Sequence, residues 1–150
     1  MRKPPGMKQP LPRLLAILPV AGLIPFVGGA LALLFGMPTI FSLSVQAIVL
    51  SYALLIVSFM AGVHWGQYLS GVRTRVDLLV SSNVVAISAW CGFLLLPQLY
   101  FCLLSIVLFI ILNSIDGHLH QQGIIDTRYW QLRQFVTSAV CVSLLVAGFA

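Results

Sequence analysis

His64 is the one residue titrating near neutral pH that lies well inside an apolar segment of this sequence. Ionisable groups within membrane-spanning segments are costly to bury, and they usually mark functional sites. An imidazole in this position could relay protons, ligate a haem or a metal ion, or hydrogen-bond a quinone or a lipid headgroup. The competing interpretation is a neutral, structural histidine bonded to Tyr68, to a loop residue or to interfacial water.

A second group of polar residues is formed by Asp116, His118 and His120, which alternate along the chain. In an extended segment their side chains would point to one side, where a divalent metal could use them. The alternation covers only three residues and lacks a companion ligand, so we interpret the segment as a solvated loop and predict no metal site. Asp116 is also placed where Arg128 or Arg133 could pair with it.

The sequence lacks the residues and motifs that several kinds of transport and catalysis require. No Asp, Glu, Lys or Arg lies in the middle of an apolar segment, which argues against an ion-coupled transporter. The sequence has no Ser-x-x-Lys, Gly-x-Ser-x-Gly, His-Glu-x-x-His or phosphate-loop motif. The three aspartates are separate, so they offer little for magnesium. These absences leave enzymatic activity undecided and predict no particular cofactor.

The length of the uncharged segments predicts the elements that position these residues. Residues 14–72 form 59 uncharged residues, enough for two membrane spans and a turn. The turn is marked by Gly36, Pro38, Thr39, Ser42 and Ser44. Residues 78–115 divide at Pro97, because proline cannot continue a helix. We therefore predict one all-α membrane domain over residues 1–150, a five-helix bundle with spans at about 14–35, 45–68, 78–96, 99–115 and 132–150.

The distribution of basic residues predicts the orientation of these spans. With the N-terminus in the cytoplasm and the C-terminus outside, the loops near 69–77 and 116–131 are also cytoplasmic. All eight basic residues then lie on the cytoplasmic side, as positively charged loops do. They are Arg2, Lys3, Lys8, Arg13, Arg73, Arg75, Arg128 and Arg133.

Small residues indicate where helices could approach one another closely. One stripe consists of Gly28, Ala32 and Gly36. A second stripe, Ser58, Gly62 and Gly66, lies on the helix at 45–68 beside aromatic side chains. We interpret the whole face as a buried helix–helix contact. The face comprises Ser51, Tyr52, Leu55, Ser58, Phe59, Gly62, Trp65 and Gly66. Pro25 should kink the first helix and leave the carbonyl of Ala21 without its usual donor.

The composition restricts partners and location. The chain has 60% hydrophobic and 7% charged residues, far fewer charges than a soluble domain. Its net charge of +5 is scattered over helix ends, which suits membrane lipids better than nucleic acid. The first thirteen residues, with four prolines, four bases and no serine, do not look like a transit peptide. We therefore expect the bacterial cytoplasmic (inner) membrane.

Several residues together resemble the uncharacterised domain-of-unknown-function family 3429, which includes transmembrane protein sixty-nine. The resemblance covers residues 14–146 and is most specific at the block 58–66, which ends in His-Trp-Gly. It implies a small multi-pass membrane protein and supplies no reaction. It adds weight to five residues that the predicted topology places at the cytoplasmic rim, namely His64, Trp65, Asp116, Trp130 and Arg133.

Two hypotheses of function follow. The first is a non-enzymatic accessory, scaffold or assembly protein, packing as a homo-oligomer or against a larger membrane-protein complex through its small-residue stripes. The second is a protein, possibly an enzyme, that binds a cofactor, a quinone or a lipid headgroup at the cytoplasmic rim. In that case His64 reads the ligand, Asp116 and Arg133 orient His64, and Trp65 and Trp130 form the walls.

Overall fold

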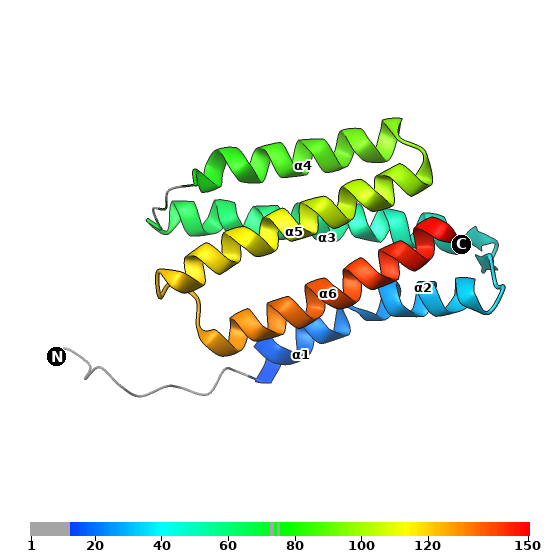
Figure 1. Ribbon diagram of the computed structural model, residues 1–150, viewed down its shortest axis with the longest axis horizontal. Coiled ribbons are helices and arrows are strands. Elements are labelled where there is room, and N and C mark those ends of the chain that lie inside the picture. Colours follow the sequence, from blue (N-terminus) through cyan, green and yellow to red (C-terminus); the bar gives the residue numbers. More distant parts are fainter. Residues whose placement is uncertain (1–12, 73, 75) are drawn as a thin grey trace.

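The chain folds as a bundle of long helices, and the computed structural model describes residues 13–72, 74 and 76–150 (Figure 1). Within these residues, five helical stretches are long and apolar enough to cross a membrane. The predicted class, an all-α multi-pass membrane protein, is confirmed. The elements are α1 (Arg13–Ala21), α2 (Ile24–Leu34), β1 (Thr39–Ile40), β2 (Leu43–Ser44), α3 (Val45–Leu69), α4 (Leu78–Leu95), α5 (Gln98–Gln121) and α6 (Thr127–Phe149).

The first predicted span, 14–35, is broken at residues 22–23, between α1 and α2 and just before Pro25. Pro25 lies in the first turn of α2, where its missing N–H costs nothing. The break exposes carbonyl groups that need donors in a membrane. The hydroxyl of Tyr52, on α3, donates to the carbonyl of Gly22 at 3.1 Å. A neighbouring helix thus supplies a donor at the kink.

The turn predicted between the first two spans is present as a short β-hairpin. β1 and β2 pair antiparallel, with Thr39 opposite Ser44. The two residues at the tip, Phe41 and Ser42, have φ of 50° and 65°. A tight two-residue turn with positive φ at both positions matches the right-handed twist of paired strands. Ser44 then caps α3, accepting from the amide of Ala47 at 3.3 Å.

The last two helices are longer than predicted. α5 continues to Gln121 instead of ending near residue 115, and α6 begins at Thr127 instead of near residue 132. The loop predicted at 116–131 is therefore wrong for most of its length. Asp126 fixes the start of α6 by accepting from the amide of Arg128 at 3.1 Å.

The helices pack around one extended apolar core. α3 lies mainly against α4, α5 lies mainly against α6, and α2 packs on α6 and α3. The core contains side chains from α2, α3, α4, α5 and α6, including Phe26, Val57, Ala89, Phe101 and Leu144. A smaller cluster near the α5–α6 connection contains Leu78, Ile115, Leu119 and Ile125.

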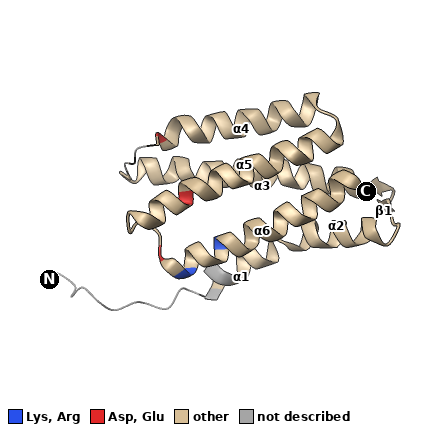
Figure 2. Cartoon of the chain, viewed as in Figure 1, with Lys and Arg blue, Asp and Glu red and all other residues tan. Residues whose placement is uncertain are grey.

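The two ends of the bundle differ in charge. We call the end with the α3–α4 and α5–α6 connections the charged end, because the Asp and Arg residues drawn in Figure 2 gather in that half. The opposite, uncharged end carries the β-hairpin, the α4–α5 connection and the end of α6. The predicted bases Arg2, Lys3, Lys8, Arg73 and Arg75 lie outside the described residues.

Candidate functional site

α3 places His64 inside the bundle. The buried side of α3 carries Val49, Ala53, Val57, Ala61 and His64, which recur at helical spacing. His64 is only 1% exposed. The sequence singled out His64 as an ionisable side chain within an apolar segment. The structure shows in addition that this side chain faces the core.

The face of α3 that we predicted to be buried points outward instead. Phe59 is 68% exposed and Trp65 is 40% exposed. A Cβ added at Gly62 or Gly66 would meet nothing within 4 Å. The interpretation of this face as a contact between helices of the chain is therefore wrong. A contact with another chain through Ser58, Gly62 and Gly66 stays a prediction.

The first small-residue stripe also differs from the prediction. Gly28 is exposed with open space beside it, and Gly36 lies beyond the end of α2 at a φ of 72°. Ala32 is buried. The close approach is made by the neighbouring Gly29, where an added Cβ would lie 2.3 Å from Cγ2 of Val49.

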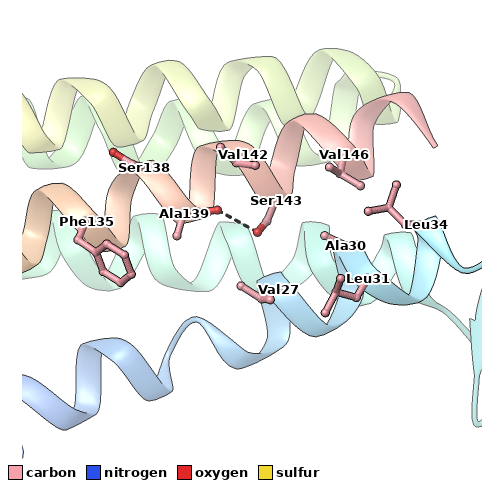
Figure 3. Close-up of a pocket in the computed structure, with 10 residues that line it drawn as sticks. All are labelled: Val27, Ala30, Leu31, Leu34, Phe135, Ser138, Ala139, Val142, Ser143 and Val146. Carbon is pink, nitrogen blue, oxygen red and sulfur yellow. Dashed lines mark hydrogen bonds between the residues drawn. The ribbon is translucent and has the colours of Figure 1, made fainter.

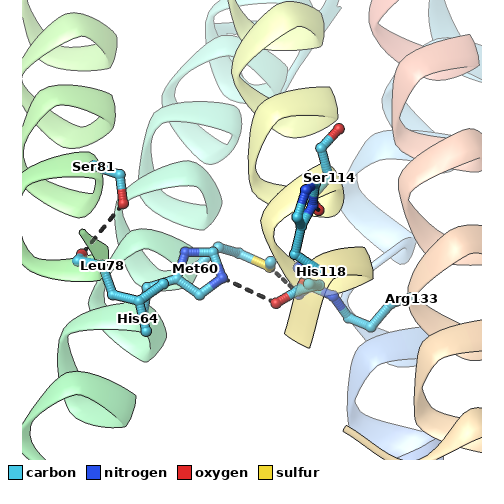
Figure 4. Close-up of polar contacts among 8 residues, drawn as sticks. Met60, His64, Leu78, Ser81, Ser114, His118 and Arg133 are labelled. Atoms are coloured by element: carbon cyan, nitrogen blue, oxygen red, sulfur yellow. Dashed lines mark hydrogen bonds and ion pairs between the residues drawn. The ribbon is translucent and has the colours of Figure 1, made fainter. Parts of the chain in front are cut away.

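Asp116 connects three helices through its two carboxylate oxygens. Its Oδ1 lies 2.9 Å from Nε2 of His64, on α3. Its Oδ2 forms an ion pair with Nη2 of Arg133, on α6. Asp116 itself is on α5 and only 3% exposed. These three residues, the buried triad, join α3, α5 and α6 in the half of the bundle nearest the charged end (Figure 4).

Arg133 makes a further contact, which could not be predicted from the sequence. Its Nη1 donates to the sulfur of Met60, one turn before His64 on α3. A thioether is a weak acceptor. Arg133 Nε is buried without a hydrogen-bond partner among the described residues. The guanidinium is therefore held firmly by Asp116 and only loosely elsewhere.

The triad fixes the chemistry of the imidazole. A carboxylate paired with a guanidinium is an acceptor only. Nε2 of His64 therefore carries a hydrogen that it donates to Asp116, and in a neutral ring Nδ1 keeps its lone pair. Carboxylate–imidazole pairs of this kind orient histidines that act as bases or as metal ligands. Here they can equally fix the register of three helices.

The two tryptophans of the predicted site are separate from the triad. Trp130 stacks on His120, with ring centroids 5.9 Å apart, and covers Gly117. It belongs to the smaller cluster, beside Leu119. Trp65 points outward from α3. Of the five predicted residues, the structure brings His64, Asp116 and Arg133 into contact, and the role of this group stays a prediction.

The alternating residues Asp116, His118 and His120 do not form a common face, because the segment is helical rather than extended. In a helix, Asp116 and His118 are about 200° apart. Nδ1 of His118 donates to the carbonyl of Ser114, and Nδ1 of His120 donates to the carbonyl of Ile125. The described residues contain no group of three metal-ligating side chains.

A groove of about 410 Å³ lies between α2 and α6 (Figure 3). Its walls are apolar apart from Ser138 and Ser143. Both serine hydroxyls donate to carbonyls of their own helix, those of Gln134 and Ala139. The groove therefore offers no free polar group to orient a ligand, and it includes no residue of the triad.

Comparison with known proteins identifies the family. The family model described as "Protein of unknown function (DUF3429)" matches residues 11–149. The chain belongs to this family. All elements from α1 to α6, and with them the whole triad, lie inside the region that matches DUF3429. No curated protein and no solved structure matches the chain.

Proposed function

We propose that this DUF3429 protein is a non-enzymatic accessory, scaffold or assembly protein of the bacterial cytoplasmic membrane. The observation that carries the proposal is the use of its three carboxylates. Asp77 caps α4 by accepting from the amides of Leu79 and Val80, and Asp126 caps α6. Asp116 is fully engaged in the triad. The chain has three acidic residues in all, so no carboxylate is left for acid–base catalysis or magnesium.

The orientation belongs to the same proposal. The charged end faces the cytoplasm, and the β-hairpin and the end of α6 lie outside. The described Arg128 and Arg133 belong to the half of α6 near the charged end, which is where positively charged segments stay during insertion. A reporter enzyme active only outside the membrane should be active when fused after Ala150, and a cytoplasmic signal there would contradict the orientation.

The outward face of α3 is the surface we assign to a partner. It combines small residues, which let another helix approach closely, with exposed aromatic side chains such as Phe59 and Trp65. Helices in lipid associate by such close packing, because lipid tails are as apolar as leucine side chains. The partner is a second copy of this chain or a larger membrane protein.

The test is purification from native membranes in mild detergent, comparing the wild-type chain with Gly62→Leu. The wild type should elute as a complex with a stoichiometric protein partner or with itself. Gly62→Leu should elute as a folded monomer, because an added side chain there meets open space in the chain but not in the complex. Gly28→Leu is the matched control, since Gly28 is equally open but lies on α2. A monomeric wild type, or a Gly62→Leu protein that keeps its partner, contradicts the proposal.

A second candidate function, the binding of a cofactor, a quinone or a lipid headgroup, is favoured by one observation. His64 Nδ1 and Arg133 Nε are buried in the triad without partners among the described residues. A small molecule that copurifies with the wild type, and is lost from a folded His64→Ala protein, would support this function. A folded His64→Ala protein that still copurifies with this small molecule would exclude a binding role for His64.

A further inference from the structure

The tautomer of His64 is the starting point. Arg133 and Asp116 form an ion pair, which requires Asp116 to be a carboxylate. A carboxylate cannot donate, so the 2.9 Å contact between its Oδ1 and Nε2 of His64 places the ring hydrogen on Nε2. In a neutral imidazole, Nδ1 then carries the lone pair and accepts a hydrogen bond.

No protein donor in the described part of the chain serves this lone pair. Nδ1 is buried and has no hydrogen-bond partner there. In Figure 4 the His64 ring is drawn between Arg133 of α6 on one side and Leu78 and Ser81 of α4 on the other. The hydroxyl of Ser81 donates to the carbonyl of Leu78, and that of Ser82 to the carbonyl of Leu79. The serines at this end of α4 are therefore already committed.

A second unpaired acceptor lies one turn away on the same side of α3. The Oε1 atom of Gln67 is buried and has no partner among the described residues. Residues three apart on a helix are neighbours on its surface, so Gln67 lies next to His64, towards the charged end. Two buried acceptors on neighbouring residues of one helix can be satisfied by one molecule with two donors, and a buried polar group without a partner is costly.

We propose that His64 Nδ1 and Gln67 Oε1 hold one buried water molecule, which donates a hydrogen bond to each. Water supplies two donors in the smallest volume, and buried waters typically satisfy polar groups in this way. A larger ligand would have to separate α3 from α4, which pack closely against each other. This inference does not depend on the accessory role proposed above.

The water site gives the triad two unequal sides. Both carboxylate oxygens of Asp116 are occupied, by His64 and by Arg133. The water lies on the opposite side of the imidazole, at Nδ1. Its other partner is Gln67, which is nearer the charged end than His64. The triad therefore meets this water at Nδ1 of His64, on the side of the ring away from Asp116.

The experiment is solid-state NMR of the full chain with ¹⁵N-labelled histidine and glutamine, in nanodiscs of a single synthetic phosphatidylcholine. His118→Gln and His120→Gln variants assign the His64 signals. We expect a protonated Nε2, an unprotonated Nδ1, and magnetisation transfer from water to Nδ1. Gln67→Leu should reduce that transfer by about half or more, because the water loses one of its two acceptors. Gln131→Leu, at an exposed position on α6, should leave it unchanged.

Each other outcome overturns the proposal. A protonated Nδ1 with an unprotonated Nε2 would reverse the tautomer. Transfer to Nδ1 from the side-chain amide protons of Gln67 would show a direct bond between the two residues in place of water. Transfer from lipid, or no transfer from water in the wild type, would show that the site holds no water. The wild-type spectrum alone decides these points, so the test does not depend on the folding of Gln67→Leu.

Discussion

The two ends of the bundle hold their helices together in different ways. Near the charged end, α3, α5 and α6 are joined by ionic and polar side chains around Asp116. Near the uncharged end, the helices approach through glycines. An added Cβ would lie 2.3 Å from Val49 at Gly29, 2.3 Å from Leu104 at Gly92 and 3.2 Å from Cys102 at Gly148.

This difference teaches how a small bundle can be specified within lipid. Apolar burial gives little preference for one helix arrangement over another, because lipid tails solvate apolar side chains equally well. Close backbone packing and hydrogen bonds must therefore set the arrangement. The DUF3429 chain has its buried ion pair in one half and its closest glycine contacts in the other, where Nε2 of Gln46 also donates to the carbonyl of Ala147 at 2.7 Å. Changes to each half should therefore have different sizes of effect.

The largest expected effect comes from removing Asp116. Asp116→Ala leaves Arg133 as a buried, unpaired charge, which costs about 3–5 kcal/mol of unfolding free energy. The measurement is equilibrium unfolding in mixed micelles. The double variant Asp116→Leu with Arg133→Met should recover most of the loss, because a buried ion pair can be replaced by apolar side chains of similar volume. A loss below about 1 kcal/mol, the level of an exposed ion pair, would show that the triad is not a buried clamp.

The next effect tests the uncharged end. Gly29→Ala forces Val49 to move, and overpacking of this kind costs about 1–3 kcal/mol. Gly28→Ala is the matched control on the same helix. It meets open space, so it should be neutral or slightly stabilising, since alanine favours helix over glycine. Equal unfolding free energies for the two variants would contradict the close approach of α2 and α3.

Much of this fold follows from the sequence, because charge and hydropathy directly mark the membrane spans. The five spans were predicted near their observed places, and so was a turn between the first two, although not that this turn is a β-hairpin. The end of α5 was missed because Asp116, His118 and His120 lower the hydropathy and look like a loop. A helix satisfies its own backbone, so it continues through polar residues wherever their side chains find partners.

The orientation of α3 could not be predicted for a related reason. In a soluble protein the buried face of a helix is the more apolar one, but in lipid both faces are apolar. Gly62, Trp65 and Phe59 therefore fit either side. The contact of His64 with Asp116 could have been predicted, since the predicted topology placed both residues at one end of the bundle. The contact between Arg133 and Met60 depends on the angles at which the helices cross, which the sequence does not reveal.

A smaller effect is expected for the two aspartates at the charged end that cap helices, Asp77 and Asp126, than for Asp116. Asp77→Ala removes a cap that accepts from two amides, those of Leu79 and Val80. We expect a loss of about 1 kcal/mol in unfolding free energy, the usual value of a helix cap. Asp126→Ala, which removes a cap with one amide bond, should cost no more. Either loss approaching that of Asp116→Ala would mean that the triad is not the main link at this end.

The smallest effect concerns the kink between α1 and α2. Tyr52→Phe removes the donor to the carbonyl of Gly22 but keeps the ring, which lies 5.0 Å from that of Phe26. Hydrogen bonds between membrane helices average about 0.6 kcal/mol, so we expect a loss of about that size. Tyr100→Phe, at a position 60% exposed on α5, is the control and should change nothing. A loss well above about 1.7 kcal/mol, the largest value found for such bonds, would mean that Tyr52 holds the kink itself in place. The half of the bundle whose helices approach through glycines would then depend on this hydrogen bond for its stability as well.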